Sequence, residues 1–555
     1  MRGSCTRLLA RRYGKGEAAG VAILALLLAL LAIRITRGAD LGDESYYAIF
    51  IDDWLKGSIA TSSFLAIHQT AALAVYPAAL AYTALKGSSD GLFLFLRALF
   101  LAGTVASALC WVIFLKRLGS QFLAWAGGIF VLSFIPFGLP APSYNTLGQQ
   151  ALTIALALFG YAALLDGRTR EQTWWLIASA CAWAVATVVY PPLIIPLGAL
   201  CLFGLWYSDG SFPRPLSYAA MTGAAVCAGW SLVIVSLTFA HLRDVLIFSS
   251  TNFGTDGWSR RLTFVQNIFG GNIPFSMLCV AAIGIGVTRH LFPLFARLAT
   301  VAVLAALFAT TPALYARSHD AVTLAALTGL GLLSGLRTNA SRPERVIGLV
   351  YATSLLAALT TSAAAFNSIY NFSIGALPAA ALAVMGRPAT KFSSVAAALS
   401  VSAAVAAVLS TSLFFYYGEL PGESLAPRER MADGFFSGLA LVPNDATLVR
   451  LVRTRIDPLL ENNPPIAIIG RLPGLALAMP ARLSMPIAYA VPGGDKWLSL
   501  QETFYRQPGR QPLFVLIYRD PYFVPSNPIP RFDNDYALTE EVKTPLGHIE
   551  IFRRR

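Results

Sequence analysis

Charged side chains are scarce in this sequence. Of its 555 residues, 13% are Asp, Glu, Lys or Arg, whereas 56% are hydrophobic. A soluble domain cannot bury that much apolar surface, because surface area grows too slowly with chain length. Apolar runs recur between residues 20 and 417, and each is long enough to cross a bilayer as a helix. The runs do not alternate as barrel strands do, so the composition predicts a polytopic α-helical membrane protein.

Three patterns common in other protein classes are also missing. No Gly-rich nucleotide signature occurs in the polar C-terminal region, so we expect no bound nucleotide there. The six cysteines lack metal-site spacing and none follows Cys279, which excludes a disulfide framework in that region. No internal repeat is visible, and this weakens the case for a transporter built from two inverted halves.

The positive charge of the chain has a distinctive distribution. A net charge of +13 would suggest nucleic-acid binding in a soluble protein. Here Lys and Arg collect in short connections between apolar runs and before the first run, as the positive-inside rule expects. We therefore predict no nucleic-acid partner and a cytoplasmic N-terminus. The first run lacks a clean small-residue cleavage site, so it is expected to stay as an anchor.

Residues 70–87 decide the predicted topology. The run is long enough to cross a membrane, but a crossing there would place Lys116, Arg117 and every later basic connection outside. If the run instead lies along the outer surface, all these connections become cytoplasmic. We therefore predict about thirteen spans and an outward C-terminus. The predicted spans cover residues 19–36, 92–115, 121–139, 147–165, 173–190, 192–207, 216–239, 274–288, 295–313, 321–336, 346–364, 372–386 and 393–415.

The composition changes near residue 418, where Pro, Asn, Asp and Arg become more frequent. Short apolar runs at Pro465–Gly470 and Pro512–Tyr518 are typical of buried strands, and Ala446–Asn463 has helical spacing. We therefore predict a transmembrane domain over residues 1–417 and a small extracytoplasmic α/β domain over residues 418–555.

The outer loop at residues 38–91 carries a cluster of acids directly after the first span, in the sequence GDESYYAIFIDDWLKGS. Asp43 and Glu44 begin this segment at the predicted membrane surface, where a general base could meet both a lipid-borne and a water-borne substrate. The alternative is a solvated amphipathic helix, in which the aromatic side chains face lipid headgroups while Asp52 and Asp53 face water.

This segment resembles the Asp-Glu-x-Tyr-Tyr-Ala signature in the first outer loop of C-type (GT-C) integral membrane glycosyltransferases. By pattern it is most similar to the protein O-mannosyltransferase and aminoarabinose transferase groups. In those families a Pro motif and then an Arg follow, and this chain has Tyr76-Pro77 and Arg97 in that order. The motifs cover only residues 42–97, whereas the number of spans and the outward C-terminal domain match over nearly the whole chain.

The resemblance implies an inverting transfer of one sugar from a polyprenyl-phosphate donor to a lipid, glycan or protein acceptor on the outer face. Asp43 would take the proton of the acceptor hydroxyl, and Glu44 would orient it or bind the acceptor. The expected location is a bacterial cytoplasmic membrane, in contact with membrane lipid and with the C-terminal domain in the periplasm. Further residues of the same region become candidate substrate-binding residues: Tyr46, Tyr47, Tyr76 and Arg97.

A lipid phosphate leaving group needs cations near the interface. Arg260 and Arg261 stand in a long outer loop, and Arg317 and His319 stand just before a later span. Related enzymes often carry an Arg at this later place before a Tyr-Leu-Leu-Pro run, which this chain lacks. All four are candidate donor-phosphate ligands, and contact with lipid headgroups is the equally weighted alternative.

Polar residues in other outer segments extend the predicted site. Tyr144 and Asn145 stand where several relatives carry an acid, and Asn can hydrogen-bond a sugar hydroxyl although it cannot act as a base. A similar polar aromatic turn occurs at Phe366–Ser373. His68 is a further candidate substrate contact. With the two adjacent acids it could hold a divalent ion, but no tight ligand spacing exists, so we predict no metal or other cofactor.

Three other functions are alternatives to a glycosyltransferase. A transporter or flippase for lipid-linked saccharides would place charges along its spans, and these spans hold almost none. A polymerase or ligase for such saccharides usually relies on Arg and His in large outer loops and lacks the early Asp-Glu pair. A non-catalytic scaffold predicts that neutralising Asp43 changes nothing.

Overall fold

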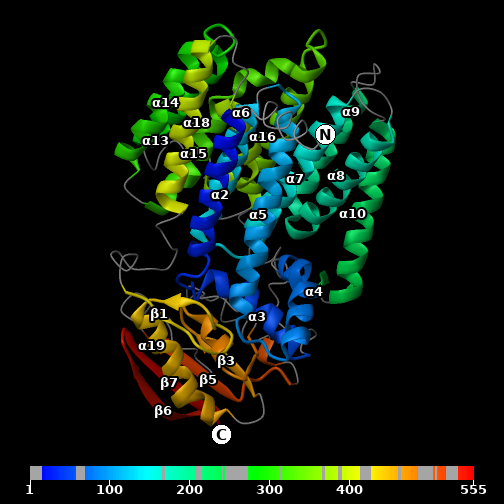
Figure 1. Ribbon diagram of the computed structural model, residues 1–555. Helices are drawn as coiled ribbons and strands as arrows, with labels where there is room; N and C mark the ends of the chain where they lie inside the picture. The colour runs from blue at the N-terminus through cyan, green and yellow to red at the C-terminus, as the bar shows by residue number, and fades with distance from the viewer. Residues whose placement is uncertain are drawn as a thin grey trace, which may run out of the picture.

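The computed structural model shows a bundle of long helices above a small sheet (Figure 1). It describes residues 15–57, 69–119, 121–165, 169–206, 215–239, 242–243, 273–311, 314–364, 369–385, 391–412, 427–460, 464–485, 504–506, 509–519 and 535–555.

The helices of the bundle follow the apolar runs of the sequence. Seven described helices are long and apolar enough to cross a membrane, one bent pair (Ala316–Leu327 with Leu330–Leu336) would make an eighth, and five apolar helices are shorter. Each predicted span coincides with one of these, and the predicted polytopic fold class is confirmed. The bundle consists of α2 (Lys15–Arg34), α5 (Leu92–Lys116), α6 (Gln121–Ser133), α7 (Tyr144–Leu164), α8 (Arg170–Val189), α9 (Ile194–Trp206), α10 (Pro215–Leu237), α13 (Ile273–Thr288), α14 (Pro293–Thr310), α15 (Leu314–Leu327), α16 (Arg342–Ala364), α17 (Ile369–Met385) and α18 (Lys391–Ser412).

The two ends of the bundle differ in chemistry. At one end, Lys116 forms an ion pair with Glu17 at 2.7 Å, and Arg342 donates to the carbonyl of Leu165 at 2.7 Å. At the other end, the backbone N–H of Gly38 donates to the carbonyl of Ala440 in the C-terminal region at 2.9 Å. The basic connections therefore lie opposite the sheet, as the charge distribution predicts.

Two further helices lie between the bundle and the sheet (Figure 1). They are α3 (Asp43–Leu55) and α4 (Gln69–Lys86), and α4 contains Pro77. Among the described helices, α4 is not one of those long and apolar enough to cross. This agrees with the interpretation that residues 70–87 stay outside the membrane.

The C-terminal region forms a five-stranded mixed sheet in the order β4-β3-β5-β7-β6. The two predicted strands are β3 and β5, which pair in parallel with Ile466 opposite Phe514. The predicted helix begins with α19 and continues through shorter helical turns. The elements are β1 (Glu429–Arg430), β2 (Ala440–Leu441), α19 (Pro443–Leu451), β3 (Pro465–Ile469), η8 (Pro473–Ala478), β4 (Arg482–Leu483), β5 (Phe514–Arg519), β6 (Tyr536–Thr544) and β7 (Gly547–Arg554).

The outer helices share one apolar core with this sheet. Buried side chains of α3, such as Phe50, Ile51 and Trp54, belong to the same cluster as Ile468 and Val515 of the central strands. Each large apolar side chain buried in this way contributes about 1.5–3 kcal/mol. The position of α3 is therefore set by the C-terminal domain as well as by the membrane helices.

Candidate functional site

The first turn of α3 is fixed by a carboxylate that precedes it. Asp40 accepts hydrogen bonds from the backbone N–H groups of Gly42 (2.9 Å) and Glu44 (3.2 Å), and its carbonyl accepts from the hydroxyl of Ser45 (2.7 Å). Side-chain oxygens of Asp commonly satisfy the unpaired N–H groups at a helix start. Burial, followed by the charge of Asp43, raises the pKa of Asp40 well above its usual range. Asp40 was not among the predicted site residues, because it stands four residues before Glu44, one more than the spacing of a capping box.

Glu44 is held in a buried ion pair with Arg97 of α5. Its Oε1 accepts from Arg97 Nε at 2.6 Å and its Oε2 accepts from Arg97 Nη2 at 2.7 Å. The two side chains are 1% and 0% exposed. Such a fork-to-fork pair fixes geometry as well as charge. Both carboxylate oxygens of Glu44 are therefore engaged by this protein's own groups.

Arg97 also connects α3 to the end of the first membrane helix. Its Nη1 donates to the carbonyls of Ile35 (2.8 Å) and Arg37 (3.1 Å), which follow α2. The guanidinium lies 5.1 Å from the ring centroid of Phe93. With no exposed surface, Arg97 joins α2, α3 and α5 and does not reach a ligand in this structure, so its predicted contact with substrate stays a prediction.

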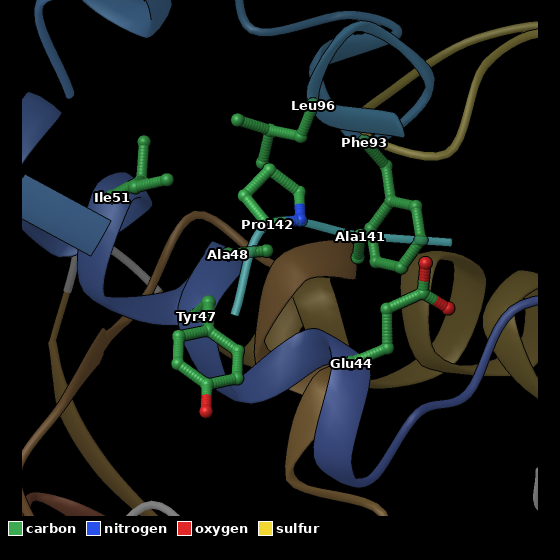
Figure 2. Close-up of a pocket in the computed structure, with 8 residues that line it drawn as sticks. All are labelled: Glu44, Tyr47, Ala48, Ile51, Phe93, Leu96, Ala141 and Pro142. Carbon is green, nitrogen blue, oxygen red and sulfur yellow. The ribbon is translucent and has the colours of Figure 1, made fainter. Parts of the chain in front are cut away.

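The space beside Glu44 is too small for a sugar. A cavity of about 10 Å³ is lined by Glu44, Tyr47, Phe93 and five neighbouring residues, and this volume holds about one water molecule. Figure 2 shows the Glu44 carboxylate close to the Phe93 ring, whereas the hydroxyl of Tyr47 points away from it. This side of α3 therefore has no room for a sugar.

Asp43 lies on α3 one residue before Glu44 but is only half-buried. Its charge acts on the phenols of Tyr47 and Tyr144, whose ring centroids are 6.5 Å apart. Burial is the main cause that raises the pKa of Tyr47, and the Asp43 charge adds to it. The structure therefore brings together Asp43, Tyr47 and Tyr144, three of the predicted site residues.

An uncharged polar cluster continues from Tyr144. The Asn145 and Asn371 side chains lie near the Tyr144 hydroxyl, and the Tyr144 ring lies 5.0 Å from that of Tyr190. Asn371 Nδ2 donates to Asn145 Oδ1 and to the Tyr190 hydroxyl, both at 3.2 Å. These residues come from the ends of α7, α8 and α17. Their amides and phenols can bind hydroxyl groups, so we call Tyr144, Asn145, Tyr190 and Asn371 the neutral cluster.

Sequence reasoning found only half of this cluster. Tyr144 and Asn145 were predicted, but Tyr190 and Asn371 were not singled out. Asn371 lies in the polar aromatic turn Phe366–Ser373, so composition gave a partial signal. Tyr190 follows an unbroken apolar helix, and only the three-dimensional fold brings it to the site.

Arg317 is a described cation that can meet a phosphate. Its Nε donates to the carbonyl of Thr311 at 2.8 Å, and its guanidinium lies 5.3 Å from the ring centroid of Phe308. Among the described residues, no hydrogen bond occupies its terminal nitrogens. The residue lies near the start of α15, at the end of the bundle that also carries α3.

His319 has a different environment from the one predicted. Its Nε2 accepts from the backbone N–H of Phe137 at 2.9 Å, and its Nδ1 lies 2.7 Å from the Ser373 hydroxyl and 3.0 Å from the Tyr370 carbonyl. Phe137 has a φ of 56°, a conformation that is costly for a bulky residue. His319 is fully buried with both ring nitrogens bonded, so here it stabilises the connection before α7, and its predicted contact with the donor phosphate stays a prediction.

The remaining predicted residues divide into two groups. Tyr46 packs against Phe50 (4.7 Å between ring centroids) and Tyr76 packs against Trp54 (5.4 Å), both in the shared apolar core. Three predicted residues lie outside the described part of the chain: His68, Arg260 and Arg261.

The interpretation of α3 as a solvated surface helix is wrong for its second half. Asp52 and Asp53 are 6% and 4% exposed. Lys56 donates to Asp52 at 2.5 Å and to the Ala481 carbonyl at 3.1 Å. These acids face the C-terminal domain, because the strands and turns of residues 473–483 cover this side of the helix. A larger cavity, of about 290 Å³, lies next to this region and away from Asp43.

No group of three His, Cys, Asp or Glu side chains within the described residues could hold a metal ion. Since His68 lies outside that part, the expectation of no metal stays a prediction.

Comparison with known proteins gives only distant similarity. No protein-family model matches the chain, and no curated protein matches it. Solved structures that resemble it include the oligosaccharyltransferase of Archaeoglobus fulgidus with a tethered acceptor peptide, at 14% identity over 97% of this chain and 74% of that chain, with a TM-score of 0.44.

ArnT from Cupriavidus metallidurans is similar over 96% of this chain and 97% of its own, at 13% identity. Its TM-score is 0.45 in the apo state and 0.42 in the structure with bound undecaprenyl phosphate. At identities and TM-scores this low, a functional assignment depends on this chain's own residues.

Proposed function

We propose that this protein is a membrane glycosyltransferase that moves one sugar from a polyprenyl-phosphate donor to an acceptor hydroxyl, with Asp43 as general base. One observation carries the proposal: a half-buried carboxylate begins a rigidly held helix at the end of a membrane bundle, next to the neutral cluster. Such a place lets a lipid-borne donor and an acceptor from outside meet at one base.

The proposed reaction is a single displacement. Asp43 takes the proton of the acceptor hydroxyl as the acceptor oxygen forms a bond to the anomeric carbon. The bond between that carbon and the phosphate oxygen breaks, and the lipid phosphate leaves with the electron pair. Attack opposite to the leaving group inverts the anomeric configuration. The acceptor is a lipid, a glycan or a protein on the face that carries the C-terminal domain, which we place outside the cytoplasm.

Glu44 has a supporting role in this proposal. Because Arg97 and the backbone N–H of Asp40 occupy its oxygens, Glu44 fixes the first turn of α3 and so the direction of Asp43. We assign to Arg317 the role of stabilising the charge of the leaving phosphate. Among the described groups, none hydrogen-bonds its terminal nitrogens. A cation there stabilises the negative charge that develops as the phosphate leaves.

The test uses the purified full chain in detergent with a panel of polyprenyl-phosphate sugars and candidate acceptors. Wild type, Asp43→Asn and Arg317→Gln are compared, with Glu541→Gln on the exposed strand β6 as a matched charge-removing control. We expect Asp43→Asn to lower kcat by about 10²–10⁴-fold, the usual contribution of a general base. Arg317→Gln should lower kcat less, and Glu541→Gln should match the wild type.

The anomeric configuration of the product, read by NMR, checks the displacement. Undiminished transfer by Asp43→Asn, or retention of configuration, would rule out the proposed base and step. Absence of transfer with every donor would count against the whole class of reaction.

A further inference from the structure

Asn371 has an unusual arrangement of hydrogen bonds. The side chain is completely buried at the start of α17. Its Oδ1 has no hydrogen-bond partner, although its Nδ2 has two. Buried polar atoms are nearly always paired, so an unpaired amide oxygen in a polar cluster calls for a physical reason.

The orientation of this amide is set by its neighbours. The Tyr190 hydroxyl donates to the carbonyl of Thr361 at 3.1 Å, so its oxygen must accept when it meets Asn371. Asn145 Oδ1 is also an acceptor. With Asn145 Oδ1 facing it, Asn371 makes both contacts through its NH₂ group, and flipping the Asn371 amide alone would put its oxygen against acceptors. In this arrangement the unpaired atom among the described groups is the carbonyl oxygen.

The unpaired oxygen belongs to the group of residues around Asp43. Tyr144 packs against Tyr190, whose hydroxyl accepts from Asn371, and it also lies within the field of Asp43. Tyr144 is half-buried, whereas Asn371 has no exposed surface. Asn371 therefore lies behind the aromatic pair of Tyr144 and Tyr190, in the same group of residues as Asp43.

We infer that Asn371 Oδ1 accepts a hydrogen bond from a hydroxyl of the donor sugar and so selects donors that carry this hydroxyl. The inference rests on the proposed function. The residues of the neutral cluster lie at the ends of membrane helices. In the proposed function, a lipid-borne sugar arrives from the membrane, and so from the side of these helices. An unpaired acceptor oxygen favours a hydroxyl donor and disfavours a carboxylate or phosphate, and the four members of the cluster carry no charge.

The experiment compares undecaprenyl-phosphate hexoses with their monodeoxy forms. Affinity is measured in an Asp43→Asn background, where turnover does not interfere, and kcat/KM is measured with Asp43 present. In the wild type, one monodeoxy donor should be worse than its parent by about 10–100-fold, because it leaves the buried oxygen unpaired. Asn371→Leu should treat the parent and that deoxy donor alike.

Tyr190→Phe is the matched control. It removes a hydrogen bond made by Asn371 Nδ2 but leaves Oδ1 in place, so it should keep the wild-type preference for the parent donor even if affinity falls for both. If Asn371 acts in packing alone, Asn371→Leu should lower the affinity for both donors by the same factor and keep the wild-type preference between them.

The inference is overturned if Asn371→Leu keeps the wild-type preference for every hydroxyl, in which case Oδ1 binds a structural water. It is also overturned if the Asp43→Asn protein binds parent and deoxy donors equally. Selective binding without transfer would support this inference while refuting the proposed reaction, so the two failures are distinguishable.

Discussion

The ion pair between Glu44 and Arg97 predicts a stability effect that is separable from catalysis. Removing the charge of Glu44 by Glu44→Gln leaves a guanidinium with no exposed surface and without its counter-charge. Breaking one partner of a buried pair typically costs about 3–5 kcal/mol, roughly a 10²–10⁴-fold rise in the unfolded fraction. Arg97→Met should cost a similar amount, because it leaves a buried carboxylate unpaired and frees the carbonyls that follow α2.

The double variant makes the prediction specific. Replacing both partners by Met removes both buried charges, and such replacements are often neutral or stabilising. We therefore expect the double variant to be more stable than either single variant. The free energies of unfolding of the wild type, Glu44→Met, Arg97→Met and the double variant are compared as a double-mutant cycle, from thermal melting of the detergent-solubilised chain under matched conditions.

The refuting result is clear. If Glu44→Gln melts like the wild type and yet abolishes sugar transfer, then Glu44 contacts substrate and its assignment as a positioning residue is wrong. If the costs of the two single variants simply add in the double variant, the side chains are not coupled as the structure requires.

Two further predictions concern the contact between α3 and the C-terminal domain. Burial raises the pKa of Asp53 to about 8, against roughly 4 in an unfolded chain. Between these two pH values the folded state keeps the proton on Asp53 and the unfolded state loses it. The free energy of unfolding therefore falls by about 5 kcal/mol as pH rises from 4 through 8. Asp53→Asn should flatten this dependence and raise the melting temperature at pH 8, and a steeper loss in the variant would contradict the assignment. A Cβ at Gly474 would lie 2.4 Å from the Ser45 hydroxyl oxygen, so Gly474→Ala should cost about 1–3 kcal/mol and reduce transfer, whereas Gly223→Ala, which meets open space, should do neither.

Much of the architecture follows from local patterns. Hydropathy runs predicted the membrane helices, and the placement of Lys and Arg identified α4 as the run that does not cross. The parallel strands β3 and β5 were visible as short apolar runs. The hairpin of β6 and β7 was not predicted, although Gly547–Arg554 alternates in polarity at its centre.

The site was less predictable, because its contacts join distant parts of the chain. Asp43 and Glu44 are neighbours with the same charge, and only the position of Arg97 separates a half-exposed carboxylate from a buried, ion-paired one. His319 resembled a surface cation in sequence, but the strained backbone at Phe137 engages it. In the same way, the sequence around Tyr190 indicates only the end of an apolar helix, and the contact with Asn371 is visible only in the structure.

The shared core of α3 and the sheet has a consequence for how the chain matures. The helix that carries Asp43 is synthesised early, but the strands that share its core are made hundreds of residues later. Until β5 and β7 pair, one side of that helix lacks its packing partner. A ribosome stalled before residue 500 would thus leave α3 without the part of its core that the sheet supplies.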